Sequence, residues 1–246
     1  MIKATGPDSL MILIPALDEE GAIAGVIREV HDVLPGVPVL VVDDCSTDGT
    51  RSHALLAGAD VLSLPYHLGL GGGVQAGYRL AFELGFSYVI RIDGDGQHDP
   101  RDIPVIFEKL KSSGCQMVIG SRFLKGDGQH SSFWRRLGIL FFRAVLRPIL
   151  DKEVHDPTSG FVGVNQEAIA VFAKSFPLEY PEIEALVVLQ RRRFRFEEVP
   201  TKMRNRQAGR SSITALKSIY YIIHVLLGVF VNILKYGERR KKRDND

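Results

Sequence analysis

Apolar runs and segments of helical periodicity alternate along the first half of the chain. Five short runs rich in Val, Ile and Leu fall at residues 10–15, 37–42, 61–64, 88–92 and 116–119. Nearly continuous apolar strands that alternate with helices are typical of a mostly parallel sheet covered on both faces. The pattern therefore predicts a doubly wound α/β domain.

Acidic residues follow three of the predicted strands. They lie in residues 15–19, in the pair Asp43 and Asp44, and in residues 93–95. Ligands of open parallel sheets bind at the carboxyl ends of the strands. We therefore expect these acidic groups to share one crevice.

The segment Asp93-Gly94-Asp95-Gly96-Gln97-His98 is the most specific of the three. Two carboxylates spaced i, i+2 in a turn can converge on one oxygen-seeking cation, and the glycines allow close approach of backbone and ligand. This spacing indicates a site for a metal and a diphosphate, although a strand-ending Asp-Gly turn without a ligand would read the same. Asp99 and Pro100 then fit an N-cap and the first residue of a helix.

The glycine-rich residues 67–74 resemble part of a dinucleotide-binding fingerprint. That fingerprint opens the helix after the first strand, whereas this segment follows the third, so a nicotinamide or flavin role is disfavoured. We expect these glycines to bring the backbone close to a nucleotide or to the sheet, with Gln75, Ala76 and Tyr78 beginning the helix.

Two apolar segments follow in the second half. Residues 133–150 carry a basic stripe of Arg136, Arg143 and Arg147, which fits either a core helix with a solvated edge or a helix at a membrane surface. Residues 218–234 have no charged side chain and precede a basic block at 239–243. As a helix they would span about 25 Å, less than the hydrocarbon core of about 30 Å.

These lengths favour a C-terminal amphipathic helix that lies at the membrane surface or docks on a partner, with the basic block at anionic headgroups. We therefore predict one domain over residues 1–212 and an apolar helix with a basic tail over residues 213–246.

Composition adds little to this picture. A chain of 246 residues with 45% hydrophobic content can bury a substantial core, and a net charge of +2 does not suggest a nucleic-acid partner. The only cysteines, Cys45 and Cys115, lack metal-ligand spacing, so we expect two buried thiols in a reducing compartment. The first ten residues lack the apolar stretch of a signal peptide, which favours a cytoplasmic location.

Five motifs, in order along the chain, resemble those of family 2 glycosyltransferases, most closely the dolichol-phosphate mannosyltransferase type. They are residues 15–19, 42–50, 93–98, 120–123 and 156–161. The resemblance implies the A-type glycosyltransferase fold, a UDP- or GDP-hexose donor, Mg²⁺ or Mn²⁺, and inversion at the anomeric carbon. It also implies a polyprenyl phosphate acceptor at the cytoplasmic membrane face, reached peripherally or through a small integral membrane partner.

The resemblance also assigns residues by position. It puts Pro15, Leu17, Glu19, Val42, Asp44 and Gly94 at the nucleotide, Asp93, Asp95 and Gln97 at the metal, Arg122 and Arg135 at phosphates, and Arg206 and Ser211 in a segment that closes over the donor. Asp95, Arg122 and Arg135 would be the catalytic residues. Glu19 and Asp48 also fit helix-capping roles. His67 departs from the family pattern, since an Asn is common at that position.

The acceptor remains open on sequence alone. An ionised phosphate is already nucleophilic and needs positioning cations more than a base. A sugar hydroxyl in polysaccharide assembly would instead need a base such as Glu182 or Glu184. An inactive membrane scaffold is a third possibility, against which the intact Asp93, Asp95 and Gln97 argue.

Overall fold

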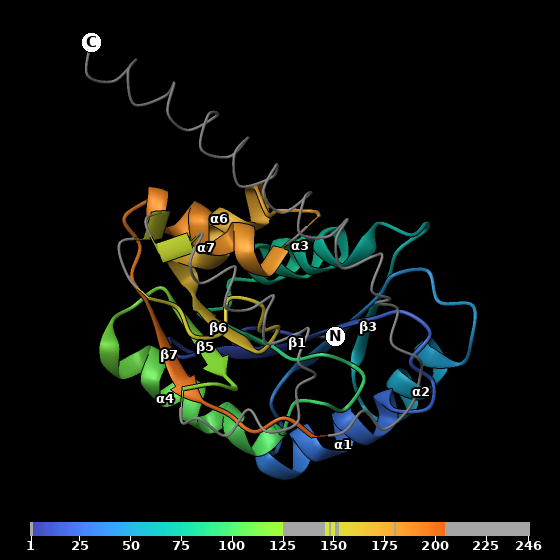
Figure 1. Cartoon of the computed structure of the whole chain (residues 1–246). Coiled ribbons are helices and arrows are strands. Elements are labelled where there is room, and N and C mark those ends of the chain that lie inside the picture. Colours follow the sequence, from blue (N-terminus) through green and yellow to red (C-terminus); the bar gives the residue numbers. More distant parts are fainter. Residues whose placement is uncertain (1, 125–145, 148, 151–152, 180, 205–246) are drawn as a thin grey trace.

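The computed structural model describes residues 2–124, 146–147, 149–150, 153–179 and 181–204. They form a seven-stranded sheet in the order β3-β2-β1-β4-β6-β5-β7 (Figure 1). Its strands are β1 (Leu10–Ala16), β2 (Val39–Asp43), β3 (Asp60–Ser63), β4 (Tyr88–Arg91), β5 (Met117–Ser121), β6 (Val162–Asn165) and β7 (Phe196–Pro200). Only β6 runs antiparallel to its neighbours β4 and β5, so the predicted mostly parallel sheet is confirmed.

Helices cover both faces of the sheet. They are α1 (Ile23–Val33), α2 (Thr50–Leu56), α3 (Gly69–Glu83), α4 (Ile103–Ser113), α6 (Gln166–Lys174) and α7 (Pro181–Arg191). Figure 1 shows α3, α6 and α7 on one face and α1, α2 and α4 on the other. Alternate residues of β1 serve the two cores: Leu13 packs on the α3 side, whereas Ile12 and Ile14 pack on the α1 side. The doubly wound arrangement follows from this alternation.

The glycine-rich segment is helical from Gly69 onward, so the prediction that this helix begins near Gln75 was wrong. Helix α3 begins at Gly69, and two of its glycines, Gly71 and Gly77, are sites of close packing. A Cβ on Gly71 would lie 2.4 Å from the Cα of Leu178, and one on Gly77 would lie 2.3 Å from Cδ1 of Leu13. Glycine is a poor helix former, but this close packing on the sheet and the 177–178 loop overrides its propensity. The expected close approach to the sheet is confirmed.

The helix start at Asp99 is also confirmed. Its carboxylate accepts a hydrogen bond from the backbone N–H of Arg101 at 3.1 Å, and Pro100 opens a short 3₁₀ turn that leads into α4. The expectation of two buried thiols holds for Cys115 but was wrong for Cys45, which is exposed. Cys45 follows β2 in a left-handed turn with φ of 68°, outside the apolar run.

Both apolar segments of the second half lie largely or wholly outside the described residues, and so do the boundary at 212 and the basic block. The division into residues 1–212 and 213–246 therefore stays a prediction. Among the helices within the described ranges, none is long and apolar enough to cross a membrane.

Candidate active site

The carboxyl ends of β1, β2 and β4 meet at a cavity of about 270 Å³. The cavity is lined by Pro15, Ala16, Leu17, Glu19, Asp44, His67, Gly69, Leu70, Gly73, Asp93, Gly94 and Asp95. The lining includes seven of the residues predicted for the nucleotide and metal. The strands are parallel neighbours, so motifs far apart in sequence converge here.

Hydrogen bonds lock together the two loops that follow β1 and β2. The backbone N–H of Asp18 donates to Ser46 Oγ at 3.0 Å, and the carboxylate of Asp18 accepts from the N–H of Thr47 at 2.8 Å. Burial favours a higher pKa for Asp48, but hydrogen bonds from Thr50 and Glu20 outweigh it and lower the pKa of this carboxyl. Asp48 accepts from the N–H of Thr50, the first residue of α2, at 2.9 Å and from the N–H of Glu20 at 3.1 Å, so it joins the two loops at the start of this helix.

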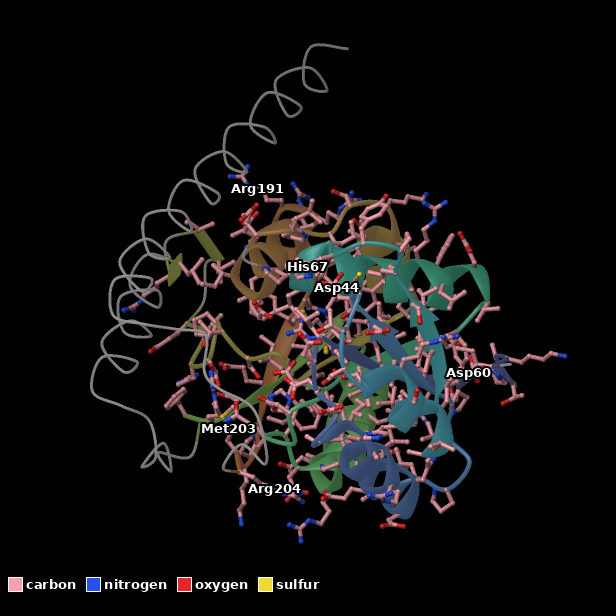
Figure 2. All side chains as sticks on the ribbon, turned by 90° about the vertical axis from the view of Figure 1, so that its right-hand side faces the viewer. Asp44, Asp60, His67, Arg191, Met203 and Arg204 are labelled. Atoms are coloured by element: carbon pink, nitrogen blue, oxygen red, sulfur yellow. The ribbon has the colours of Figure 1, made fainter. Side chains whose placement is uncertain are left out.

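Asp44 and His67 form a hydrogen-bonded pair on the cavity wall, and Figure 2 shows them close together. One carboxylate oxygen of Asp44 lies 2.9 Å from His67 Nδ1, and the other accepts from the N–H of Leu68 at 2.7 Å. The Asp44 side chain is 8% exposed, whereas that of His67 is 61% exposed. His67 uses Nδ1 for this pair, and its Nε2 is a second polar atom of a residue that lines the cavity. The pair thus holds Asp44 rigidly and adds a second polar group to the lining.

The loop after β4 holds its two carboxylates in place. One oxygen of Asp95 accepts from the N–H of Gln97 at 2.9 Å, and the N–H of Asp93 donates to His98 Nδ1 at 3.1 Å. The ring of His98 is buried and stacks on Phe161 with centroids 5.0 Å apart. Burial lowers the pKa of His98 more than the nearby Asp93 and Asp95 raise it, so the ring is neutral and braces the loop. Sequence reasoning did not assign His98 this role.

The lining residues fit a hard divalent cation. Asp93 and Asp95 both line the cavity and offer carboxylate oxygens, the donors that Mg²⁺ and Mn²⁺ prefer. Among the residues that the structure describes, no cluster of three or more His, Cys, Asp or Glu could hold a metal by itself. Mg²⁺ is commonly bound by one or two carboxylates together with substrate phosphates, and this pair suits that arrangement. Gln97 is half-buried and is not among the lining residues, so its ligand role stays a prediction.

Arg122 is joined to the 156–161 motif. Its Nε and Nη2 each donate to Asp156 at 2.6 Å, and Nη2 also donates to Thr158 Oγ1 at 3.0 Å. Asp156 is fully buried. This fork-to-fork geometry is the strong form of an arginine–carboxylate pair. Two of the five motifs are thus held together, and the predicted binding of phosphate by Arg122 stays a prediction.

The final described segment is hydrogen-bonded to the loop after β4, which carries Asp93 and Asp95. The N–H of Arg204 donates to the carbonyl of Gln97 at 2.8 Å, and its guanidinium pairs with Glu29 and Asp99. The pKa of Asp99 falls to about 2, because hydrogen bonds from Arg101 and Arg204 outweigh its burial. Arg204 is therefore an anchor at the entry to the predicted closing segment.

The remaining predicted residues lie elsewhere. Val42 is fully buried in the core on the α3 side and is not among the lining residues. Arg135, Arg206 and Ser211 lie outside the described residues. Glu182, a candidate base, is paired with Arg91 at 2.6 Å, and Glu184 is buried. A charged residue inside the apolar run 88–92 was the one sequence signal of that pair.

Comparisons with known proteins identify the family of the chain. The glycosyl transferase family 2 model matches residues 11–172. Polyprenol monophosphomannose synthase of Mycolicibacterium smegmatis is 30% identical over 166 residues, which cover 65% of this chain and 62% of that protein. Undecaprenyl-phosphate mannosyltransferase of Micrococcus luteus is 34% identical over 122 residues, which cover 48% of this chain and 49% of that protein. The matches thus span about half to two-thirds of these relatives.

A solved structure supports the fold. Glucosyl-3-phosphoglycerate synthase of Mycobacterium tuberculosis, determined with Mn²⁺, UDP and phosphoglyceric acid, superposes with a TM-score of 0.69 at 22% identity, covering 92% of this chain and 78% of that one. The expected A-type glycosyltransferase fold is confirmed. Because the family model matches more than half of the residues of this chain, the chain belongs to glycosyl transferase family 2.

Proposed function

We propose that the protein transfers a hexose from a nucleotide-diphosphate sugar to a polyprenyl phosphate, with inversion, at the cytoplasmic face of the membrane. The cavity that joins Asp44 to Asp93 and Asp95 is the observation that carries the proposal. It offers a polar wall for a nucleobase and, beside it, two carboxylates for a cation. The names of the two relatives, both of which describe mannosyl transfer to polyprenyl phosphates, support this acceptor class.

The chain's own residues position the donor. Pro15, near the end of β1, lines the cavity together with Leu17 and Glu19 of the loop that follows. Asp44 and His67 belong to the same lining. Asp93 and Asp95 would hold Mg²⁺ or Mn²⁺ together with the diphosphate. When bound, the cation supplies Lewis-acid stabilisation of the charge on the departing nucleotide.

The surroundings of the two candidate bases, Glu182 and Glu184, favour a phosphate acceptor over a sugar hydroxyl. A phosphate oxygen attacks without losing a proton, so the site needs orientation and positive charge rather than a general base. Glu182 is held by Arg91, and Glu184 is buried and has a contact of its own. Attack on the face opposite the departing diphosphate inverts the anomeric carbon. We assign Arg135 to the lipid phosphate and Arg206 and Ser211 to closure over the donor.

Residues 213–246 would attach the protein to the membrane through the apolar helix and the basic block, directly or through a small integral membrane partner. The basic side chains of the block complement anionic headgroups, each contributing about 1 kcal/mol near the surface.

The test is a transfer assay with the purified protein. UDP- and GDP-hexoses are incubated with Mg²⁺ or Mn²⁺ and a short polyprenyl phosphate, and the lipid product is identified by mass spectrometry and its anomeric configuration by NMR. Asp95→Asn should remove most turnover while the circular dichroism spectrum stays unchanged. Asp60→Asn makes the same chemical change at the start of β3, well away from Asp44 in Figure 2, and should keep turnover.

Two results would contradict the proposal. Transfer to a sugar hydroxyl but not to the polyprenyl phosphate would assign the protein to polysaccharide assembly. Wild-type turnover in Asp95→Asn with an unchanged metal requirement would remove Asp95 from the metal site.

A further inference from the structure

The guanidinium of Arg91 is buried next to the loop that carries Asp93 and Asp95. Arg91 is the last residue of β4, two residues before Asp93, and its side chain is 2% exposed. Removing a guanidinium from water is costly unless partners compensate for it. Its Nη2 donates to Glu182 Oε1 at 2.6 Å, and its Nε donates to the carbonyl of Gly160 at 2.8 Å. Arg91 therefore connects three segments that are distant in sequence.

Gly160 brings the partners of Arg91 against Asp93. A Cβ on Gly160 would lie 2.6 Å from Arg91 Nη2 and 2.9 and 3.0 Å from the two carboxylate oxygens of Asp93. The backbone of the 156–161 motif is thus packed onto both charged groups at once. Any shift of Arg91 must move this loop, Asp93 or both.

Arg91 also supplies positive charge beside the carboxylates of Glu182 and Asp93. Burial lowers the pKa of Arg91, but the nearby carboxylates of Glu182 and Asp93 outweigh it and raise that pKa. The proposed reaction brings an anionic diphosphate to the cavity that Asp93 lines. Arg91 is the group that offsets these carboxylates.

We propose that Arg91 is a positioning residue that joins the donor and acceptor halves of the site. It sets Asp93 against the loop at Gly160, and it holds Glu182 in an ion pair so that Glu182 does not act as a base. The acceptor must then arrive already ionised, as a phosphate does. This inference rests on the proposed function.

The test uses a neutral replacement of the pair. Arg91→Met alone leaves Glu182, which is 14% exposed, without its cationic partner and is expected to destabilise the fold. The double variant Arg91→Met with Glu182→Leu removes both charges, and apolar replacements of this kind are commonly tolerated. Thermal melts establish that the double variant folds, and Mn²⁺ binding in the presence of UDP or GDP is then measured by electron paramagnetic resonance.

We expect the folded double variant to bind Mn²⁺ with nucleotide about 10- to 100-fold more weakly than the wild type, as is usual when a group that orients a metal ligand is lost. Arg91→Lys should recover only part of this loss, since a lysine lacks the planar fork that serves Glu182 and Gly160 together. Wild-type Mn²⁺ binding by the folded double variant would overturn the positioning role.

Glu182→Gln tests the second part of the proposal, that Glu182 does not act as a base. The amide can still accept a hydrogen bond from Arg91, so transfer to a polyprenyl phosphate should fall less than tenfold. A loss above about 100-fold, within the range for removal of a general base, would overturn the inference about Glu182. Failure of the wild type to use any phosphate acceptor would refute the proposed function, whereas the Mn²⁺ measurements would still decide the role of Arg91.

Discussion

Two glycines of α3 offer a test of how this helix is seated at the site. A Cβ at Gly71 would lie 2.4 Å from both Cα and O of Leu178 and 2.5 Å from the carbonyl oxygen of Pro177. These are backbone atoms, so they cannot move aside as a flexible side chain could. A Cβ at Gly73 would lie 3.8 Å from Val42 Cγ1, an ordinary contact. Gly73→Ala is therefore a matched control in the same helix.

The magnitudes follow from two opposing effects. Replacing Gly by Ala inside a helix stabilises by about 1 kcal/mol, which applies to both variants. Overpacking costs about 1–3 kcal/mol and applies only at Gly71. Gly73→Ala should therefore raise the free energy of unfolding by up to about 1 kcal/mol, and Gly71→Ala should be less stable than Gly73→Ala by about 1–3 kcal/mol.

Urea denaturation followed by circular dichroism measures this difference. Equal m-values in the two variants would show that the change is in stability and not in the extent of unfolding. In thermal melts, each kcal/mol should separate the Tm values by about 2–4 °C for a domain of this size. Equal stability of Gly71→Ala and Gly73→Ala would refute the close contact between α3 and the 177–178 loop.

Three further predictions concern other parts of the molecule. Asp99→Asn should lower the free energy of unfolding at neutral pH by at most about 2 kcal/mol, because Arg101 and Arg204 lower the pKa of Asp99 to about 2 in the folded protein. A pKa that is lower in the folded protein contributes stability above the ordinary pKa of 3.8. The difference in free energy of unfolding between wild type and Asp99→Asn should therefore shrink as the pH of the urea melts falls from 4 toward 2. A constant difference would contradict this prediction. His67→Ala should weaken UDP or GDP binding about tenfold in calorimetry, because the charged carboxylate of Asp44 loses the hydrogen bond that it accepts from His67. Unchanged affinity would remove His67 from the nucleotide site. Deleting residues 213–246 should abolish flotation with anionic vesicles. About 1 M salt should release the wild type only partly, because salt screens the basic block but does not affect apolar burial. Undiminished flotation after the deletion would shift the membrane contact to residues 133–150.

Periodicity alone determined the layered architecture. The apolar runs became β1 to β5 with small shifts at their ends, because strands inside a covered sheet need continuous apolar side chains; β3, at the sheet edge, is only partly buried. The acidic motifs could likewise be placed together, since parallel strands bring their carboxyl ends to one edge. Asp44, Asp93 and Asp95 meet at the cavity for this reason.

Tertiary structure alone decided which side chains pair. Arg91 and Glu182 are 91 residues apart, and Arg122 and Asp156 are 34 apart. Their meeting depends on β6 entering antiparallel between β4 and β5, a choice that the alternation of apolar and polar residues does not encode. The start of α3 at Gly69 has the same origin. Local propensity opposes a helix there, and only the tertiary packing shows why glycine is needed at Gly71, which lies against Leu178, and at Gly77, which lies against Leu13.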